Sequence, residues 1–225
     1  MNTKNNLIIK CLKKSLIASC QPISKGPLDS SSFILASAKA SIIGGEKALR
    51  IEGFKNLKVV KKNINLPVIG IKKRISSKYP IIITPLLSDV EKLAESGADI
   101  IAFDSTLRNR PFSVNKLISK IHSYNKLAMA DCSSVKDALN AFDNGADILS
   151  TTLSGYTGDK PIPKNPDFKL LDSLINKFKV PIIAEGRFNT PALFKKAIVA
   201  GAHSVVVGTA LNRIELITRS FLDEK

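Results

Sequence analysis

Three stretches of the sequence share one design: ESGADIIAF (residues 95–103), DNGADILST (143–151) and VAGAHSVVV (199–207). Each contains a glycine (Gly97, Gly145 or Gly201), then alanine, then a short run of residues that favour β-strands. A glycine just after a helix accepts the left-handed backbone conformation without steric cost, so a strand can follow in a tight turn. The repeated design predicts consecutive helix–strand units with parallel strands, whose burial on both faces explains their nearly continuous apolar character.

Working outward from these stretches, the sequence predicts eight strands separated by segments of helical periodicity. The predicted strands are residues 17–20, 48–51, 67–71, 99–103, 127–131, 147–150, 181–185 and 204–207. The predicted helices include residues 57–63, 88–96, 114–124, 135–144, 168–178 and 191–200. Ser88, Ser134 and Thr190 with Pro191 are typical helix starts. A chain of 225 residues without a break in composition predicts one (β/α)8 TIM barrel over residues 1–225, with a short helix before the first strand.

A doubly wound open sheet is the alternative α/β architecture. Such a sheet usually carries a glycine-rich dinucleotide loop after an early strand, and the sequence has no GxGxxG motif. The closed barrel is therefore favoured.

The composition is that of a protein with a large core. Hydrophobic residues make up 44% of the chain and the mean hydropathy is +0.07. The longest apolar runs fall far short of the roughly 20 residues of a membrane-spanning helix. The N-terminal segment interrupts its apolar residues with lysines and has no small-residue cleavage site, so we expect a cytoplasmic protein with no membrane partner.

The chain is basic, with 34 Lys and Arg against 19 Asp and Glu, a formal net charge of +15. The lysines are spread along the chain, there are no glycine–aromatic RNA motifs and there is no tryptophan, so we expect no nucleic-acid partner. A positive field would instead help to attract an anionic substrate.

Cysteine and histidine offer little catalytic chemistry. Cys11, Cys20 and Cys132 lack metal-type spacing, and we expect reduced thiols. His122 falls at the end of a predicted helix and His203 at the start of the last strand, so neither is placed to bind a metal with the strand-end carboxylates. A His-ligated metal site and a serine-type triad are therefore not expected.

Four predicted strands end on residues that can transfer a proton or bind an anion: Lys73, Asp104, Asp131 and Glu185. In a parallel barrel these ends open on one face, where the long loops 72–80 and 151–166 also lie. Removing a proton from a carbon next to a carbonyl requires a base with a pKa near the working pH, which a lysine reaches when it is desolvated or surrounded by cations. The pattern predicts an enzyme with Lys73 as base.

The neighbours of Lys73 bear on this prediction. Lys72 and Arg74 flank it and are expected to lower its pKa. Because side chains alternate along a strand, only one of the two lysines should face the pocket.

A phosphate site is predicted at the ends of the last two strands. There AEGRFNTP and VVVGTALNR place Gly186 and Gly208 where the backbone can approach an anion closely. Thr209 can donate its hydroxyl, and Arg187 can pair with the anion through two hydrogen bonds.

The motifs SCQP (residues 19–22), ALRIEG (48–53), GIKKR (70–74), ITP (83–85), AFDSTLRNRP (102–111), MAD (129–131), TTLSGYT (151–157), PDF (166–168), AEGR (184–187), NTP (189–191) and VVVG (205–208) occur in this order. Over nearly the whole chain they resemble the N-acetylmannosamine-6-phosphate 2-epimerase family. The resemblance implies a (β/α)8 barrel without metal or nucleotide cofactor. It also implies interconversion of N-acetylmannosamine 6-phosphate and N-acetylglucosamine 6-phosphate in sialic-acid and amino-sugar catabolism.

By matching motif, the resemblance implies that Lys73 is the catalytic lysine and Glu185 its assisting carboxylate. The residues implied to contact the substrate are Gln21, Arg50 and Asp131, with a phosphate grip of Gly186, Arg187, Gly208 and Thr209. The chain departs from the family pattern at Lys72, at Cys132 and Ser133, and at Thr209.

Two other functions remain open at this point. A strand-end lysine also suits a Schiff-base aldolase or another phosphosugar isomerase. A barrel that has lost activity would be a basic binding protein. A homodimer is compatible with every reading.

Overall fold

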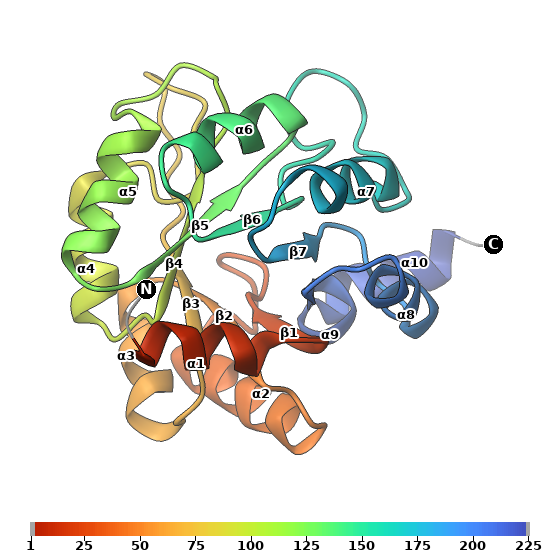
Figure 1. Ribbon diagram of the computed structural model, residues 1–225. Coiled ribbons are helices and arrows are strands. Elements are labelled where there is room, and N and C mark those ends of the chain that lie inside the picture. The colour runs from red at the N-terminus through yellow and green to blue at the C-terminus, as the bar shows by residue number, and fades with distance from the viewer. Residues whose placement is uncertain (1–2, 224–225) are drawn as a thin grey trace.

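In the computed structural model, which describes residues 3–223, eight parallel strands close into a barrel (Figure 1). β1 pairs with both β2 and β8, and every other strand pairs with its neighbours in sequence. The strands are β1 (Ser15–Cys20), β2 (Ala48–Glu52), β3 (Val68–Ile71), β4 (Ile100–Asp104), β5 (Leu127–Asp131), β6 (Ile148–Ser150), β7 (Ile182–Glu185) and β8 (Ser204–Val207). The prediction of a (β/α)8 barrel is confirmed. Residues 1, 2, 224 and 225 of the predicted extent lie outside the described residues.

The predicted strands agree with the observed ones to within two residues. β5 and β8 have the predicted bounds. The largest difference is at β1, which begins at Ser15 rather than at residue 17 because Ser15 and Leu16 pair with β8. Such pairing depends on a strand at the other end of the chain.

Ten helices lie among the described residues. They are α1 (Thr3–Leu12), α2 (Ser31–Ile43), α3 (Phe54–Asn63), α4 (Leu87–Glu95), α5 (Val114–Ser123), α6 (Val135–Asp143), α7 (Phe168–Lys177), α8 (Pro191–Val199), α9 (Thr209–Asn212) and α10 (Ile214–Asp223). The sequence did not predict α2, whose apolar residues form no single stripe and of which only Ile34 and Ala38 are buried. It also missed the short α9 and the terminal α10.

Side-chain caps begin several of these helices. Ser134 accepts a hydrogen bond from the Asp137 backbone N–H, and Thr190 accepts one from that of Leu193, as their sequence positions predict. Ser88 was predicted to begin α4, but the helix begins one residue earlier. The carboxylate of Asp89 accepts the backbone N–H of Leu86 there, so an acidic residue inside the helix caps it.

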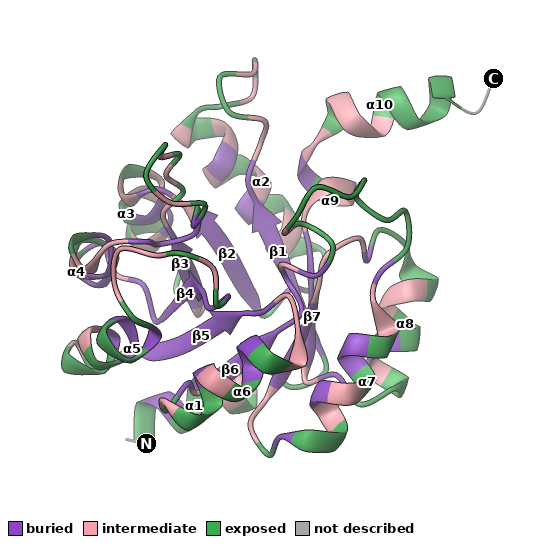
Figure 2. Cartoon of the chain, turned by 90° about the horizontal axis from the view of Figure 1, so that it is seen from above, coloured by how far each residue is buried: buried purple, intermediate pink, exposed green. Residues whose placement is uncertain are grey.

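The hydrophobic core has two layers. Inward-facing side chains such as Ile17, Ile69 and Leu127 fill the barrel, and a larger cluster packs the strands against the surrounding helices. Figure 2 shows the strands buried and the outer helix faces exposed. The barrel is therefore a packed scaffold, and any ligand site lies at its ends.

The C-terminal helix is an exception to this layering. α10 has no buried residues among those described and lies at the edge of the molecule in Figures 1 and 2. Its exposed apolar residues include Ile214, Phe221 and Leu222. None of the described helices combines the length and apolar character needed to cross a membrane.

Candidate active site

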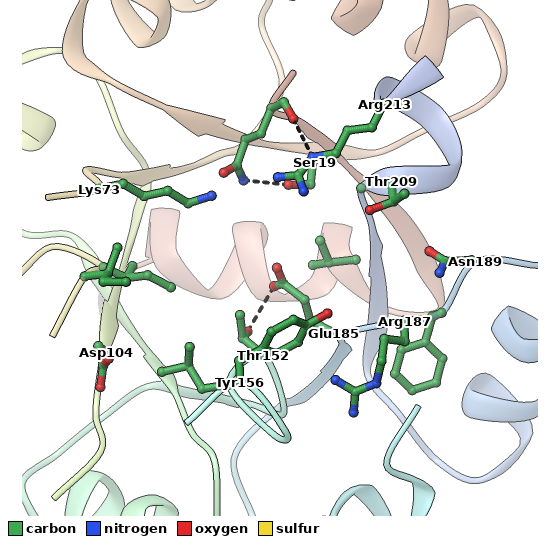
Figure 3. Close-up of a pocket in the computed structure, with 18 of the residues that line it drawn as sticks. Ser19, Lys73, Asp104, Thr152, Tyr156, Glu185, Arg187, Asn189, Thr209 and Arg213 are labelled. Atoms are coloured by element: carbon green, nitrogen blue, oxygen red, sulfur yellow. Dashed lines mark hydrogen bonds between the residues drawn. The ribbon is translucent and has the colours of Figure 1, made fainter. Parts of the chain in front are cut away.

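A cavity of about 440 Å³ opens at the carboxyl ends of the strands (Figure 3). Residues from six strand ends line it, among them Gln21 after β1, Lys73 after β3, Asp104 on β4 and Glu185 on β7. The strand-end residues named by the sequence therefore do meet at one face, except for Asp131, which is fully buried and does not line the cavity.

Lys73 extends into this cavity from the β3–α4 loop (Figure 3). Its side chain is exposed to the solvent of the cavity, and the lining residues surround it with protein atoms. This burial, followed by the positive charges of Arg213 and Arg50, lowers the pKa of Lys73 to about 8. A lysine with this pKa can act as a base near neutral pH.

The two basic neighbours of Lys73 have other partners. Lys72 points away from the cavity, with its Nζ 2.9 Å from Glu52 Oε1. Arg74 donates from Nε and Nη2 to the carboxylate of the buried Asp89. The expectation that Lys72 and Arg74 lower the pKa of Lys73 is therefore wrong, because their charges are paired elsewhere. Only one of the two lysines faces the cavity, as strand alternation predicts.

A short antiparallel pairing fixes the backbone around Lys73. Lys73 forms a bridge with Ile83, the Arg74 N–H donates to Ile82 O at 2.9 Å, and the Thr84 N–H donates to Lys72 O at 2.7 Å. The catalytic candidate therefore lies on a braced segment rather than on a free loop.

Glu185 faces Lys73 across the cavity (Figure 3) and rests on a buried polar network. Its Oε2 lies 3.1 Å from Arg50 Nη1 and 3.1 Å from Thr152 Oγ1. Arg50 also holds Asp131, with Nη2 to Oδ2 at 2.6 Å, and Thr152 Oγ1 lies 2.8 Å from Asp131 Oδ1. Arg50 and Asp131 are almost completely buried.

The number of protons in this network bears on the state of Glu185. The Thr152 hydroxyl has one proton but lies within hydrogen-bond distance of Asp131, of Glu185 and of the Ser150 hydroxyl, which can itself donate to it. If this proton is donated to Asp131, a hydrogen bond between Thr152 and Glu185 requires a proton on the Glu185 carboxyl, which then donates to the Thr152 oxygen. Burial, against the opposing effect of Arg50, raises the pKa of Glu185 to about 7. The geometry and the pKa agree on a carboxyl that can be protonated near neutral pH.

Arg50 and Asp131 were expected to contact a substrate. The structure places both below Glu185 rather than in the lining of the cavity, because their charges pair with each other in the buried floor. In this structure they orient Glu185.

Gln21 does line the cavity. Its Nε2 donates to Ser19 Oγ at 2.6 Å, while its buried Oε1 has no hydrogen-bond partner among the described residues. That oxygen is available to accept a hydrogen bond from a ligand.

The predicted phosphate residues line the cavity at the β7 and β8 ends. Gly186 has a φ of +103°, which an L side chain would strain, and Gly208 and Thr209 begin α9. Arg187 uses two of its five N–H donors within the protein: its Nε donates to Asn165 O at 2.8 Å and its Nη1 to Ser154 O at 2.7 Å. Its guanidinium also stacks on Tyr156. Nη2 and the second hydrogen of Nη1 have no partner among the described residues, so the two-bond interaction with an anion stays a prediction, and Arg187 also holds the β6–α7 loop.

Sequence reasoning missed several lining residues, which are Ser19, Thr152, Tyr156, Asn189 and Arg213. Arg213 matters most, because it lines the cavity beside Gln21, whose backbone oxygen accepts its Nε at 3.1 Å. It ends the segment VVVGTALNR that predicted the phosphate site, and its position one helical turn after Gly208 was the available signal.

Neither the two histidines nor the three cysteines line the cavity. His122 pairs with Asp147 at 2.8 Å, and His203 lies 2.8 Å from Ile9 O. Within residues 3–223 no group of three or more histidine, cysteine or carboxylate side chains could hold a metal ion, and no disulfide is formed.

The sequence matches a protein-family model described as "Putative N-acetylmannosamine-6-phosphate epimerase" over residues 34–225. The chain belongs to this family. It is 47% identical over 216 residues to a Pasteurella multocida protein named "Putative N-acetylmannosamine-6-phosphate 2-epimerase", covering 96% of this chain and 94% of that one. A Photobacterium profundum protein of the same name is 46% identical, with 100% and 94% covered.

Solved structures agree with the family. The N-acetylmannosamine-6-phosphate 2-epimerase of Clostridium perfringens superposes with a TM-score of 0.93 at 40% identity, covering 96% of each chain. A thiamine phosphate pyrophosphorylase of Pyrococcus furiosus, at 15% identity and a TM-score of 0.60 with 88% of each chain covered, shares only the fold. The family suggested by the motif order is confirmed.

Proposed function

We propose that this protein is a cofactor-free epimerase that interconverts N-acetylmannosamine 6-phosphate and N-acetylglucosamine 6-phosphate at C2, in sialic-acid and amino-sugar catabolism. One observation carries the proposal beyond family membership. Lys73, with a lowered pKa, and Glu185, with a raised pKa, face each other across one cavity at the barrel mouth. Groups whose environments move their pKa values in this way are suited to proton transfer.

The proposed reaction begins with the open-chain sugar. The C2 hydrogen is acidic only when C1 is an aldehyde, because the resulting carbanion is then stabilised as an enolate. With a pKa of about 8, Lys73 is a neutral amine in about one molecule in ten at pH 7. Its nitrogen takes the C2 proton, the C–H electron pair forms the C1–C2 double bond, and negative charge moves to the C1 oxygen.

A proton then returns to the opposite face of C2. Protonated Glu185 can supply it directly, or it can stabilise the C1 oxygen while Lys73 returns the proton. The positive charge of Arg213 acts on Lys73 from the β8 side of the cavity and also favours the negative enolate.

Phosphate binding is proposed for the β7 and β8 ends. Gly186, Gly208 and Thr209 present backbone and hydroxyl groups to the cavity. Arg213 adds a positive charge for the phosphate, beside Arg187, which also donates to the Ser154 carbonyl. A phosphate held there would keep the reactive open chain in place.

Incubation with N-acetylmannosamine 6-phosphate in D₂O, followed by NMR, tests the proposal. We expect N-acetylglucosamine 6-phosphate carrying deuterium at C2, because the hydrogens of the lysine ammonium exchange with solvent. Complete retention of the original C2 hydrogen, or no conversion, would contradict it. Borohydride trapping of sugar on Lys73 would instead support a Schiff-base enzyme.

A homodimer and a cytoplasmic location stay predictions. The exposed apolar residues of α10, Ile214, Phe221 and Leu222, support a second copy as their cover. Light scattering at micromolar concentration would contradict the dimer if it gave only the monomer mass.

A further inference from the structure

The lining of the cavity includes an apolar wall, one member of which is next to Lys73. We define the wall as Ile83 and Leu153, both of which line the cavity. Ile83 is the bridge partner of Lys73, and directly paired residues of antiparallel segments project to the same face, so the two side chains are neighbours. Leu153 packs against the inner-barrel cluster that contains Ile83.

Ile83 lies away from the phosphate end, whereas Leu153 follows β6, the neighbour of β7. In a closed barrel of eight strands in sequence order, β3 lies opposite β7 and β4 opposite β8. Ile83 is held between β3 and β4, because its carbonyl accepts the Asp104 backbone N–H at 3.0 Å. The apolar lining residues Phe188 and Val206 lie at the opposite β7 and β8 ends.

The proposed substrate has one group that matches such a wall. Every backbone carbon of the open-chain sugar carries oxygen or nitrogen, so the methyl of the acetamido group is its only fully apolar carbon. That group is attached to C2, the carbon that must lie at Lys73. With the phosphate at the β7 and β8 ends, the chain spans the cavity and brings its acetyl end to the β3 side.

The geometry points to Ile83 and Leu153 as the specificity-determining surface for the N-acyl group of the substrate. This inference rests on the proposed function. Contact with the methyl removes apolar area from water and holds the C2 substituent in one orientation, which sets the C2 hydrogen toward the lysine nitrogen. A polar acyl group would lose hydrogen bonds to water on the same surface.

The test compares N-acetyl, N-propanoyl and N-glycolyl mannosamine 6-phosphate as substrates. For the unmodified protein we expect kcat/KM for the N-glycolyl sugar to be about 10-fold or more below that for the N-acetyl sugar. Leu153→Ala opens space, so the ratio of kcat/KM for N-propanoyl to N-acetyl sugar should rise by about 5-fold or more. Ile83→Val, which removes one methylene from the buried partner, should shift the ratio in the same direction by less.

Ile162 supplies the matched control. It lies in the same loop as Leu153 but is exposed and does not line the cavity, so Ile162→Ala should leave all three ratios unchanged. Equal losses for all three sugars in Leu153→Ala and Ile83→Val would mean that the wall is structural and would overturn the inference alone. Failure of the unmodified protein to convert the N-acetyl sugar would overturn the proposed function, and the inference with it.

Discussion

At the scale of single residues, the adjacent side chains of Lys72 and Lys73 have different environments. Lys73 lies in the cavity between the charges of Arg213 and Arg50, whereas Lys72 pairs with Glu52 and lies 5.7 Å from the centre of the Phe54 ring. Lys73 is therefore the proposed base, whereas its neighbour Lys72 forms an ion pair outside the cavity. The strand alternation that reverses side-chain direction accounts for the difference.

We expect Lys73→Ala to lower kcat by about 10³-fold with a small change in KM, because proton transfer is lost in the transition state while most binding contacts remain. Lys72→Ala is the matched control and should lower kcat less than 10-fold. Steady-state kinetics with N-acetylmannosamine 6-phosphate measures both. An exchange of the two phenotypes would place Lys72 rather than Lys73 in the cavity, and full activity of both variants would contradict the mechanism.

At the scale of elements, one arginine fastens the loop between β6 and α7. Arg187 donates to the backbone oxygens of Ser154 and Asn165, which lie near the two ends of this loop, and stacks on Tyr156, whose ring centre is 5.1 Å away. Arg187 itself adopts a φ of +66°, which is uncommon for a residue other than glycine. The loop therefore covers the cavity because a residue after β7 holds it there.

We expect Arg187→Ala to release the loop and so to increase the rate of trypsin cleavage after Lys164 by about 10-fold or more. The cleaved bond precedes Asn165, whose carbonyl Arg187 holds, and local opening controls cleavage of such a loop. Lys160 is followed by proline and is a poor trypsin site. Mass spectrometry of the fragments identifies the site.

Arg219→Ala serves as the control, because it removes an exposed arginine from α10. An unchanged cleavage rate after Lys164 in Arg187→Ala would show that the two carbonyl hydrogen bonds do not hold the loop. The same variant should raise KM for the phosphorylated sugar, since the loop and the phosphate end share this side chain.

At the scale of the whole molecule, buried acids make stability depend on pH. Glu46, between α2 and β2, is 8% exposed, and its Oε2 has no hydrogen-bond partner within residues 3–223. Burial raises its pKa from 4.5 to about 7, against a smaller opposing effect of a hydrogen bond with the Ala18 backbone. The folded protein therefore binds the Glu46 proton more tightly than the unfolded chain does.

The sign of the effect follows from this difference. Between about pH 4.5 and pH 7 the unfolded chain releases the proton while the folded protein retains it, so the free energy of unfolding falls as pH rises through this range. Glu46→Gln removes the titration, and we expect it to stabilise the protein relative to the unmodified chain by about 1–3 kcal/mol at pH 8 and by much less at pH 5.

Urea unfolding at the two pH values measures the difference. Glu95→Gln, on the exposed face of α4, is the matched control, and its effect should be small and the same at both pH values. A Glu46→Gln effect that did not grow with pH would mean that the carboxyl finds a partner when it ionises.

The sequence by itself determined the barrel and the residues at its mouth. Gly97, Gly145 and Gly201 have φ values of +98°, +91° and +108°, so the turns that they predicted are present. Lys73 and Glu185 were placed correctly because side-chain direction in a strand depends on period-two alternation, and the carboxyl ends of parallel strands share one face. These properties are local or follow directly from the order of the elements.

Only the tertiary structure decided the environment of those residues. The pKa of Lys73 depends on Arg213, which lies between two helices that the sequence did not predict, and Arg187 donates to carbonyls of another loop. The placement of Arg50 beneath Glu185 likewise depends on contacts between strands on different sides of the barrel. Electrostatic and hydrogen-bond energies vary with distance over a few ångströms, and distances between segments remote in sequence are set by the packing of the whole barrel.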